Sequence, residues 1–305
     1  MILIITHKED YTADYLIDKL NNKGISYHRF NCEDCLKQNI SLQFGEIEMK
    51  AIHQIHKFDS VWYRRTKLPE LEGACPEEKI YLLHEIDTFL FNLFAIIKGK
   101  WLSHPESIRR AENKFYQLSL ARESGFHVPN TIITTDRSVL KEFFKQNDQT
   151  VVKPISKGRI NYSDNTSKLI FTNIVSRSIF AELDNFELTP AIFQEHIDKD
   201  YEIRVTVVGE NVFGAVVYSQ TDMDTVVDWR RKKLQFLKYD VPEDLRNKCI
   251  GMLKALGISF GAFDFIRSKS GKYYFLEVNP NGQWVWIEND TRQPISESII
   301  NFLSC

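Results

Sequence analysis

The sequence predicts a mixed fold in which an α/β unit comes first and α+β units follow. Residues 1–5 are a short apolar run, Tyr11–Asn22 has the spacing of an amphipathic helix that ends at Gly24, and "ISYHRF" at 25–30 predicts a second strand. This β-α-β order is typical of an α/β unit. Beyond Gly125 the chain is rich in strand-like runs separated by turn residues, which favours hairpins. With 305 residues and 43% hydrophobic content, the chain is long enough for two or three structural units.

The charges of the chain are nearly balanced. It has 39 basic and 41 acidic residues and a formal net charge of −2, so the total charge does not call for a nucleic-acid partner. The N-terminal residues contain neither a basic leader nor a small-residue cleavage site, and the apolar runs stay short of a membrane span. We therefore expect a cytoplasmic protein that binds neither nucleic acid nor membrane.

The first unit is expected to contain a further strand and a long helix. "SVWYRRT" at 60–66 predicts a strand that ends in two arginines, and residues 79–99 predict an apolar helix that ends at Gly99. We expect the unit to end near Pro105. No G-x-G-x-x-G follows the first strand and the chain has no G-x-x-x-x-G-K-[ST], so a dinucleotide fingerprint and a P-loop find no support. A nucleotide, if one binds, must be held in another way.

Two lysines are expected at the ends of elements. The residues from Ser107 predict a helix that contains Lys114 and breaks at Gly125, and "TVVKPI" predicts a short strand that ends at Lys153. A lysine held as a point charge suits a phosphate group, whereas a solvated lysine is the simpler interpretation of either residue taken alone.

One predicted strand has a polar face in the middle of a β-rich region. Glu202, Arg204 and Thr206 share that face, whereas the residues between them are apolar, and Gly209–Asn211 predicts the hairpin turn that follows. An arginine beside a glutamate on such a face indicates either a structural ion pair or a binding site, and the strand alone favours the ion pair.

A second hairpin carries two acids and an amide. Glu277 and Asn279 are two residues apart on a strand and therefore share a face. "GAFDFI" predicts the partner strand, and Ser270-Gly271 predicts the turn, which would bring Asp264 alongside Glu277. Carboxylate and amide oxygens suit a hard cation, and the alternative is an edge hairpin whose acids face water.

The five cysteines, at positions 32, 35, 75, 249 and 305, do not resemble the disulfide framework of a secreted protein. Cys32 and Cys35 form a C-x-x-C, and His53 and His56 follow it, which raises a Cys2His2 zinc site. The long gap between the pairs and the close histidines do not match zinc-finger spacing, so ordinary loop and surface residues are favoured.

The ordered strings of the chain resemble the ATP-grasp superfamily. The set is Lys114, "VVKP", "QEHI", "EIRVTVVG", "DWRR", "FDF" and "FLEVNPNGQW". The last strings, with "VWYRR" and "RAENK", are more narrowly similar to the maturases of graspetides, of the microviridin and grasp-with-spasm types. Those enzymes cross-link side chains within ribosomal precursor peptides. The resemblance runs over nearly the whole chain.

The resemblance implies a nucleotide site and names its residues. Asp264, Glu277 and Asn279 match the family's magnesium ligands, and Lys114 and Lys153 match its phosphate contacts. The adenine hinge matches Gln194, Glu195, His196 and Ile197. Glu202 matches the ribose contact, and Arg204 matches the contact to the γ-phosphate. Arg230 is a candidate for the substrate carboxylate or phosphate, against a solvated side chain. The chain departs from many relatives after Lys153, where "PISKGRINYSDNTSK" holds a single glycine instead of a glycine-rich flap.

The resemblance also implies the domains, the reaction and the partners. The fold would be an ATP-grasp fold with a pre-ATP-grasp α/β domain at 1–109, a central lid subdomain at 110–190 and a C-terminal subdomain at 191–305. ATP and two Mg²⁺ ions would serve to activate Asp or Glu side chains as acyl-phosphates, which Ser, Thr or Lys side chains attack. The substrate would be a precursor peptide with leader and core segments, and the enzyme a homodimer.

Two alternatives remain open at this stage. A ligase of the same fold could act on a free amino acid, a small metabolite or a protein tail, as RimK-like enzymes do. A non-catalytic nucleotide-binding protein could retain the fold, although the intact set of charged residues counts against it. The residues that handle ATP do not identify the acceptor.

Overall fold

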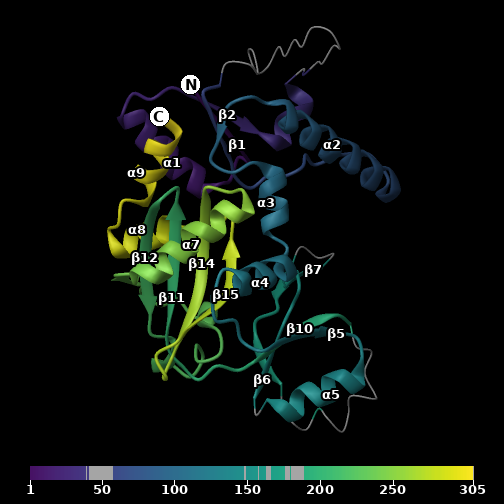
Figure 1. The fold of residues 1–305 in the computed structure, drawn as a ribbon. Helices are drawn as coiled ribbons and strands as arrows, with labels where there is room; N and C mark the ends of the chain where they lie inside the picture. The colour runs from purple at the N-terminus through teal and green to yellow at the C-terminus, as the bar shows by residue number, and fades with distance from the viewer. Residues whose placement is uncertain are drawn as a thin grey trace.

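The computed structural model describes residues 1–38, 40, 58–147, 149–156, 158–162, 166–175, 179 and 189–304. Figure 1 shows three regions along the molecule: a first unit that contains the N-terminus, a large antiparallel sheet covered by helices, and a small sheet beside helix α5. The predicted combination of an α/β unit with α+β units is confirmed.

The first unit is a parallel sheet of four strands in the order β2-β1-β3-β4. Its elements are β1 (Ile2–Thr6), α1 (Tyr11–Asn22), β2 (Tyr27–Asn31), the 3-10 helix η1 (Cys32–Lys37), β3 (Ser60–Tyr63), α2 (Pro76–Ile96) and β4 (Lys100–Trp101). The predicted strands and helices are present, and strands alternate with helices along this part of the chain. Asp10 accepts hydrogen bonds from the backbone N–H groups of Thr12 and Ala13 and so begins α1.

The region from 105 to 123 forms two helices, and the expectation of one helix is wrong. Helix α3 spans Pro105–Ala111 and helix α4 spans Lys114–Glu123. Asn113 lies between them, and its side chain accepts hydrogen bonds from the N–H groups of Phe115 and Tyr116. This N-cap starts a new helix and makes Lys114 its first residue.

The small sheet has the strand order β5-β10-β6-β9. Its elements, with a separate two-stranded sheet, are β5 (Thr131–Thr134), α5 (Arg137–Gln146), β6 (Thr150–Lys153), β7 (Arg159–Asn161), β8 (Ser167–Leu169), β9 (Asn173–Val175) and β10 (Ala191–Glu195). Leu140, Phe143 and Phe144 of α5 pack with Phe193 of β10 in a core of their own. Lys153 is the last residue of the short strand β6, as predicted, and β6 lies between β10 and β9 in the sheet.

The large sheet has the order β13-β12-β11-β14-β15 and is antiparallel throughout. Its elements and those that cover it are β11 (Lys199–Val208), β12 (Asn211–Val217), the 3-10 helices η4 (Ser219–Thr221) and η5 (Trp229–Arg231), β13 (Leu237–Tyr239), α7 (Glu243–Leu256), β14 (Phe260–Ser268), β15 (Tyr273–Asn279), α8 (Val285–Thr291) and α9 (Ile295–Ser304). Both predicted hairpin turns are present, with Gly209 at φ +60° and Gly271 at φ +85°.

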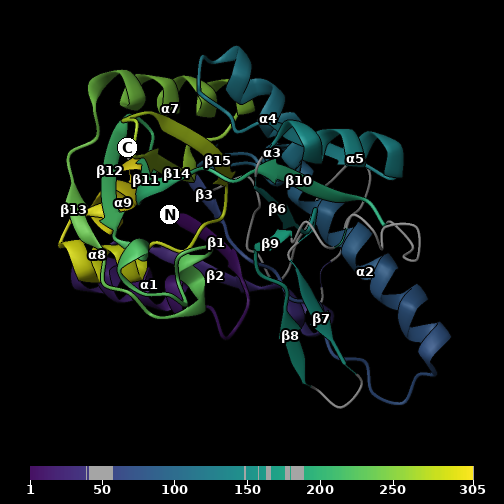
Figure 2. The ribbon, with the colours of Figure 1, turned by 90° about the horizontal axis from the view of Figure 1, so that it is seen from below.

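Each face of the large sheet has its own core. Figure 2 shows α7 along one face and α1 and α8 on the other side. Ile203, Val205 and Val207 of β11 pack with α7, whereas Val208 packs with residues of α1, α8 and α9. Because strand residues alternate, Glu202, Arg204 and Thr206 lie on the face opposite α7. No helix among the described residues is long and apolar enough to cross a membrane.

The close packing of β12 against β13 predicts a cost of adding one methyl group. A Cβ atom on Gly214 would lie 2.4 Å from the backbone oxygen of Tyr239 and 2.5 Å from Val241. We expect Gly214→Ala to lower the free energy of unfolding by about 1–3 kcal/mol.

Urea unfolding measures this effect, and Gly251→Ala is the matched control. Gly251 lies within α7 and has no atom within 4 Å of an added Cβ, so alanine there should raise stability by about 0.5–1 kcal/mol. Equal stability of Gly214→Ala and the unmodified protein would contradict the packing described.

Candidate functional site

The centre of the site is a row of three charged side chains on adjacent strands. In the register of the large sheet, Arg204 of β11 is opposite Asp264 of β14, and Asp264 is opposite Glu277 of β15. Arg204 donates from Nη1 to both carboxylate oxygens of Asp264, at 2.9 and 3.1 Å. The row places one cation and two carboxylates side by side on the sheet face away from α7.

Asn279 completes this row. Its Nδ2 lies 3.3 Å from an oxygen of Asp264 and 3.3 Å from an oxygen of Glu277. A register shift between Asp264 and Phe265 interrupts the pairing of β14 with β15 at this point. Such irregularities alter the direction of side chains and are common beside functional sites. The predicted proximity of Asp264 and Glu277 is thus present, and Asn279 joins them.

The two predicted lysines approach the row from other elements. Lys114 lies at the start of α4, with its Nζ 3.7 Å from an oxygen of Glu277, and donates to the backbone oxygen of Pro154 at 3.3 Å. Lys153 donates to Oε1 of Gln194 at 2.7 Å, and Gln194 donates in turn to Oγ1 of Thr131 at 2.9 Å. Gln194 is buried, so this pair of hydrogen bonds fixes the direction of Lys153.

The charges of these groups shift one another's pKa values. Burial acts to raise the pKa of Glu277, but the charges of Lys114 and Lys153 outweigh it, and the pKa lies below its ordinary value. Burial raises the pKa of Asp264 to about 6, with Arg204 opposing the rise and Glu277 adding to it. Burial also lowers the pKa of Lys153 to about 8. Perturbed groups gathered in this way are typical of functional sites.

Glu202 and Arg230 have partners that the sequence did not reveal. Glu202 is buried and accepts hydrogen bonds from Lys199 at 2.8 Å and from the hydroxyl of Ser219 at 2.6 Å. The guanidinium of Arg230 donates two hydrogen bonds to Asp228, at 2.8 and 2.5 Å, which raise its pKa, and the backbone N–H of Arg230 donates a third at 3.1 Å. Asp228 also accepts from the backbone N–H of Thr172.

The predicted hinge residues lie at the end of β10 and directly after it. The backbone N–H of Asn130 donates to the carboxylate of Glu195 at 3.3 Å, and the N–H of His196 donates to the oxygen of Gln149 at 3.0 Å. Burial lowers the pKa of His196, and Ile197 is buried. The structure therefore brings Arg204, Asp264, Glu277, Asn279 and Lys114 into contact, whereas the hydrogen bonds of Glu195, Glu202 and Arg230 go elsewhere.

The three oxygen-bearing side chains fit a hard cation. Within the described ranges, no three His, Cys, Asp or Glu residues gather as a metal site. Asp264, Glu277 and Asn279 converge, and rotation of the Asn279 amide would direct Oδ1 towards an ion in place of Nδ2. An ion held by two carboxylates and an amide needs further oxygens, which phosphate groups would supply.

The zinc alternative involves two cysteines of the first unit and two histidines that the structure does not describe. Cys32 and Cys35 are buried in the core of the first unit, and burial raises the pKa of both thiols. His53 and His56 lie outside the described residues.

Gly282 is a site residue that the sequence analysis missed. A Cβ atom there would lie 2.7 Å from the Cβ of Ala262 and 3.0 Å from Nη2 of Arg204. Only glycine lets the turn after β15 approach Arg204 so closely. The string "NPNG" is the signal that could have identified it.

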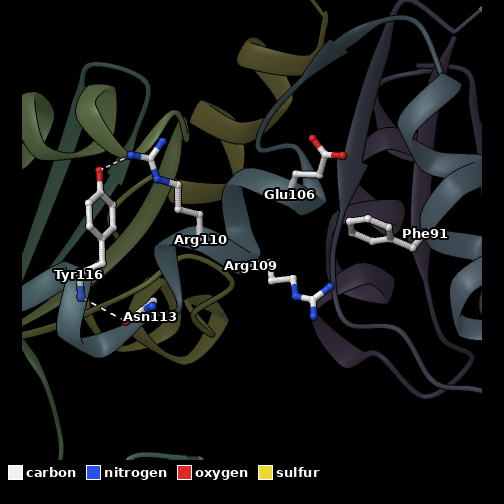
Figure 3. A pocket seen from close by; sticks show the side chains of 6 residues that line it. All are labelled: Phe91, Glu106, Arg109, Arg110, Asn113 and Tyr116. Atoms are coloured by element: carbon white, nitrogen blue, oxygen red, sulfur yellow. Dashed lines mark hydrogen bonds between the residues drawn. The ribbon is translucent and has the colours of Figure 1, made fainter. Parts of the chain in front are cut away.

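A separate cavity of about 480 Å³ lies between α2, α3 and α4 (Figure 3). Its lining residues are Phe91, Glu106, Arg109, Arg110, Asn113 and Tyr116. In Figure 3, Arg110 points to the hydroxyl of Tyr116, to which it donates at 2.6 Å. None of the predicted site residues lines this cavity, so it is distinct from the site around Arg204, Asp264 and Glu277.

Solved structures of ligases superpose on nearly the whole chain. A RiPP-associated ATP-grasp ligase from Chryseobacterium gregarium, in complex with ADP and a leader and core peptide, is 29% identical with a TM-score of 0.88, covering 99% of this chain and 96% of that one. The macrocyclase MdnC from Microcystis aeruginosa, bound with the precursor peptide MdnA, is 25% identical with a TM-score of 0.88, covering 100% and 99%.

A more distant structure shares the fold. The ATP-grasp ligase PsnB, complexed with a phosphomimetic variant of a minimal precursor, Mg and ADP, is 16% identical with a TM-score of 0.83, covering 99% of this chain and 97% of that one. The search for relatives among curated proteins returned no match.

Two family models match the chain in sequence. The MvdD pre-ATP-grasp domain matches residues 1–109, and the RimK-like ATP-grasp domain matches residues 111–303. The second match covers more than half of the chain and contains every predicted site residue. The chain therefore belongs to the RimK-like ATP-grasp family and carries an MvdD-type pre-ATP-grasp domain ahead of its ATP-grasp domain.

Proposed function

We propose that the chain is an ATP-dependent ligase that cross-links side chains within a ribosomal precursor peptide. It joins a carboxylate of an Asp or Glu residue to a Ser or Thr hydroxyl, as an ester, or to a Lys amine, as an amide. The observation that carries the proposal is the row of Arg204, Asp264 and Glu277, with Asn279 and Lys114 in contact with it. Two relatives that superpose on the whole chain were solved with precursor peptides.

The reaction requires activation because a carboxylate is a poor electrophile. An oxygen of the peptide carboxylate attacks the γ-phosphorus of ATP, ADP leaves, and an acyl-phosphate forms. The hydroxyl or amine then attacks the carbonyl carbon, gives up its proton, and phosphate leaves. The chain needs no nucleophile of its own for these steps, so its task is to orient the groups and to stabilise charge.

Three side chains at the centre of the site are the metal ligands in this proposal. Asp264, Glu277 and Asn279 would hold Mg²⁺, and we place two ions there. When bound, the ions neutralise charge on the phosphate oxygens and orient them. Lys114 and Lys153 contact phosphate groups, and Arg204 stabilises the negative charge that develops on the γ-phosphoryl oxygens. Arg204 would exchange part of its pairing with Asp264 for the phosphate.

The remaining predicted residues take the nucleotide and the peptide in this proposal. Residues 194–197 bind adenine, Glu202 binds ribose, and Arg230 binds the substrate carboxylate or phosphate. The ATP site lies between a lid at 110–190 and a C-terminal subdomain at 191–305, with the pre-ATP-grasp domain at 1–109. Because the reaction consumes ATP, we place it in the cytoplasm.

The family match supports one other candidate. The ATP-grasp domain matches the RimK-like model, so a ligase that acts on a free amino acid, a small metabolite or a protein tail has the same nucleotide site. The two candidates differ in the molecules that are joined and share the nucleotide site.

Peptide mass distinguishes these candidates. The protein is incubated with Mg²⁺, ATP and candidate precursor peptides encoded next to its gene, and the peptides are weighed. We expect ATP-dependent loss of one water per link, with one phosphate released for each. Alkaline hydrolysis should restore the mass if the links are esters, whereas amides should survive. Deletion of the leader segment should slow the reaction far more than it changes the affinity for ATP.

The Glu277→Gln variant is the control for this experiment. It keeps the size of the side chain but removes a charged metal ligand, so we expect ATP turnover at least ~100-fold lower with the fold intact. Unmodified peptides together with rapid turnover of a free amino acid would overturn the cross-linking proposal and leave the other candidate.

Arg204 tests the difference between a structural ion pair and a group that acts on the phosphate. Lysine cannot reproduce the planar fork of the guanidinium, so Arg204→Lys should lower kcat by about 100-fold while the affinity for ADP changes by less than about tenfold.

The matched control is Arg267→Lys, because Arg267 lies on the same sheet but donates to Tyr273, outside the site. We expect Arg267→Lys to retain normal turnover. An Arg204→Lys variant with a lowered melting temperature and normal turnover would show that the ion pair is structural only.

The pKa values of two site residues predict how nucleotide affinity depends on pH. Metal binding needs charged Asp264, whose pKa is about 6, so affinity for ADP with Mg²⁺ should fall as the pH drops through that value. Phosphate binding needs protonated Lys153, whose pKa is about 8, so affinity should also fall as the pH rises above that value. Each limb should approach about tenfold per pH unit.

Titration calorimetry between about pH 5 and about pH 9 measures both limbs. Arginine stays protonated throughout this range, so Lys153→Arg should remove the alkaline limb and keep the acidic one. A flat profile in the unmodified protein would be inconsistent with these assignments.

A further inference from the structure

A buried arginine lies where the first unit meets the turn after β15. Arg64 directly follows β3 and is 2% exposed. Its backbone N–H donates to the oxygen of Ile5 at 2.9 Å, which continues the pairing of β3 with β1. Its guanidinium packs over the ring of Trp62 at 5.4 Å. None of the assignments made for the nucleotide site uses this residue.

Arg64 contacts Asn281 through both its side chain and its backbone. Its Nη1 lies 3.5 Å from the oxygen of Asn281, and Asn281 donates from Nδ2 to the oxygen of Arg64 at 3.2 Å. Asn281 belongs to the turn in which the N–H of Gly282 donates to the oxygen of Asn279 at 3.1 Å. The two contacts thus tie the first unit to the turn that carries Asn279 and that packs against Arg204 through Gly282.

Stability alone does not account for an arginine at this position. Nη2 of Arg64 is buried and has no hydrogen-bond partner among the described residues, and Nε is 3.4 Å from Asp10. Asp10 has other partners, because it caps α1 and accepts from Thr6 at 2.8 Å. A buried ion pair with incomplete hydrogen bonding contributes little net stability, because two apolar side chains in place of the pair are often as stable. Removal of Arg64 alone would leave the buried Asp10 without its cation, so thermal unfolding must accompany any test of Arg64.

We infer that Arg64 is a positioning residue of the first unit, which holds the turn from Asn279 to Gly282 so that Asn279 stays beside Asp264 and Glu277. The inference rests on the proposed metal site at these three residues. Arg64 acts through Asn281 and does not touch the ion. Groups that orient a metal ligand in this way change metal affinity by about 10- to 100-fold when they are removed.

The test measures binding of ADP by titration calorimetry over a range of Mg²⁺ concentrations, without peptide and without turnover. In Arg64→Met we expect the Mg²⁺ concentration for half-maximal binding to rise by about tenfold or more, and high Mg²⁺ to restore binding. Arg64→Lys, which keeps the charge, should show a smaller rise. Asn281→Ala removes the hydrogen bond from Nδ2 to the backbone oxygen of Arg64, which is the other half of the contact, and should also raise this concentration.

Arg65→Met is the matched control, since Arg65 is the exposed neighbour of Arg64 and the substitution is identical. It should leave the Mg²⁺ dependence unchanged. Thermal unfolding reports folding, and Arg64→Lys, which keeps the charge beside Asp10, keeps the test decisive if Arg64→Met does not fold.

The outcomes separate the inference from the proposed function. Mg²⁺ dependence in Arg64→Met and Asn281→Ala equal to that of the unmodified protein would overturn the inference and leave the metal site standing. Binding of ADP that does not depend on Mg²⁺ in the unmodified protein would overturn the metal site, and the inference with it. A lowered melting temperature with unchanged Mg²⁺ dependence would assign Arg64 a structural role only.

Discussion

The register of β11, β14 and β15 is the constraint on which the rest of the site depends. It sets Arg204, Asp264 and Glu277 side by side, although two of the three carry the same charge. The register is fixed by the apolar residues next to them along the strands, such as Val205 and Phe263, which pack against α7. A slip of one residue would move Arg204 into that core and the apolar side chains out of it. Packing on one face of the sheet therefore secures chemistry on the other.

The carboxylates of Asp264 and Glu277 are stabilised by cations from three elements. Arg204 comes from the same sheet, Lys114 from the first turn of α4, and Lys153 from the small sheet. The charges of Lys114 and Lys153 hold the pKa of Glu277 below its ordinary value despite burial. Burial raises the pKa of Asp264, although the charge of Arg204 opposes the rise. In the proposed function, these two carboxylates and the cations around them would bind a metal ion and phosphate groups at once. That combination is what transfer of a phosphoryl group from ATP requires.

Local parts of the fold could be predicted from the sequence, whereas long-range contacts could not. The pairing of Asp264 with Glu277 follows from strand alternation and a short turn, so the residues were predicted together. The break before Lys114 was missed, because an N-cap within an otherwise helical run gives a weak signal. No periodic pattern of residues indicates the partners of Glu202 and Arg230. The same holds for the contact of Arg64 with Asn281. Family resemblance identified the candidate ligands, but no sequence pattern could show what holds them in place.

A crystal structure with ADP and Mn²⁺ tests the central claim most directly, because anomalous scattering locates each ion. The account predicts one or two peaks about 2.0–2.3 Å from oxygens of Asp264, Glu277 and Asn279, with the phosphates of ADP completing the ligands. It also predicts that the Asn279 amide turns to direct Oδ1 at an ion. Anomalous peaks elsewhere would contradict this account, as would well-ordered ADP with no ion beside these three residues.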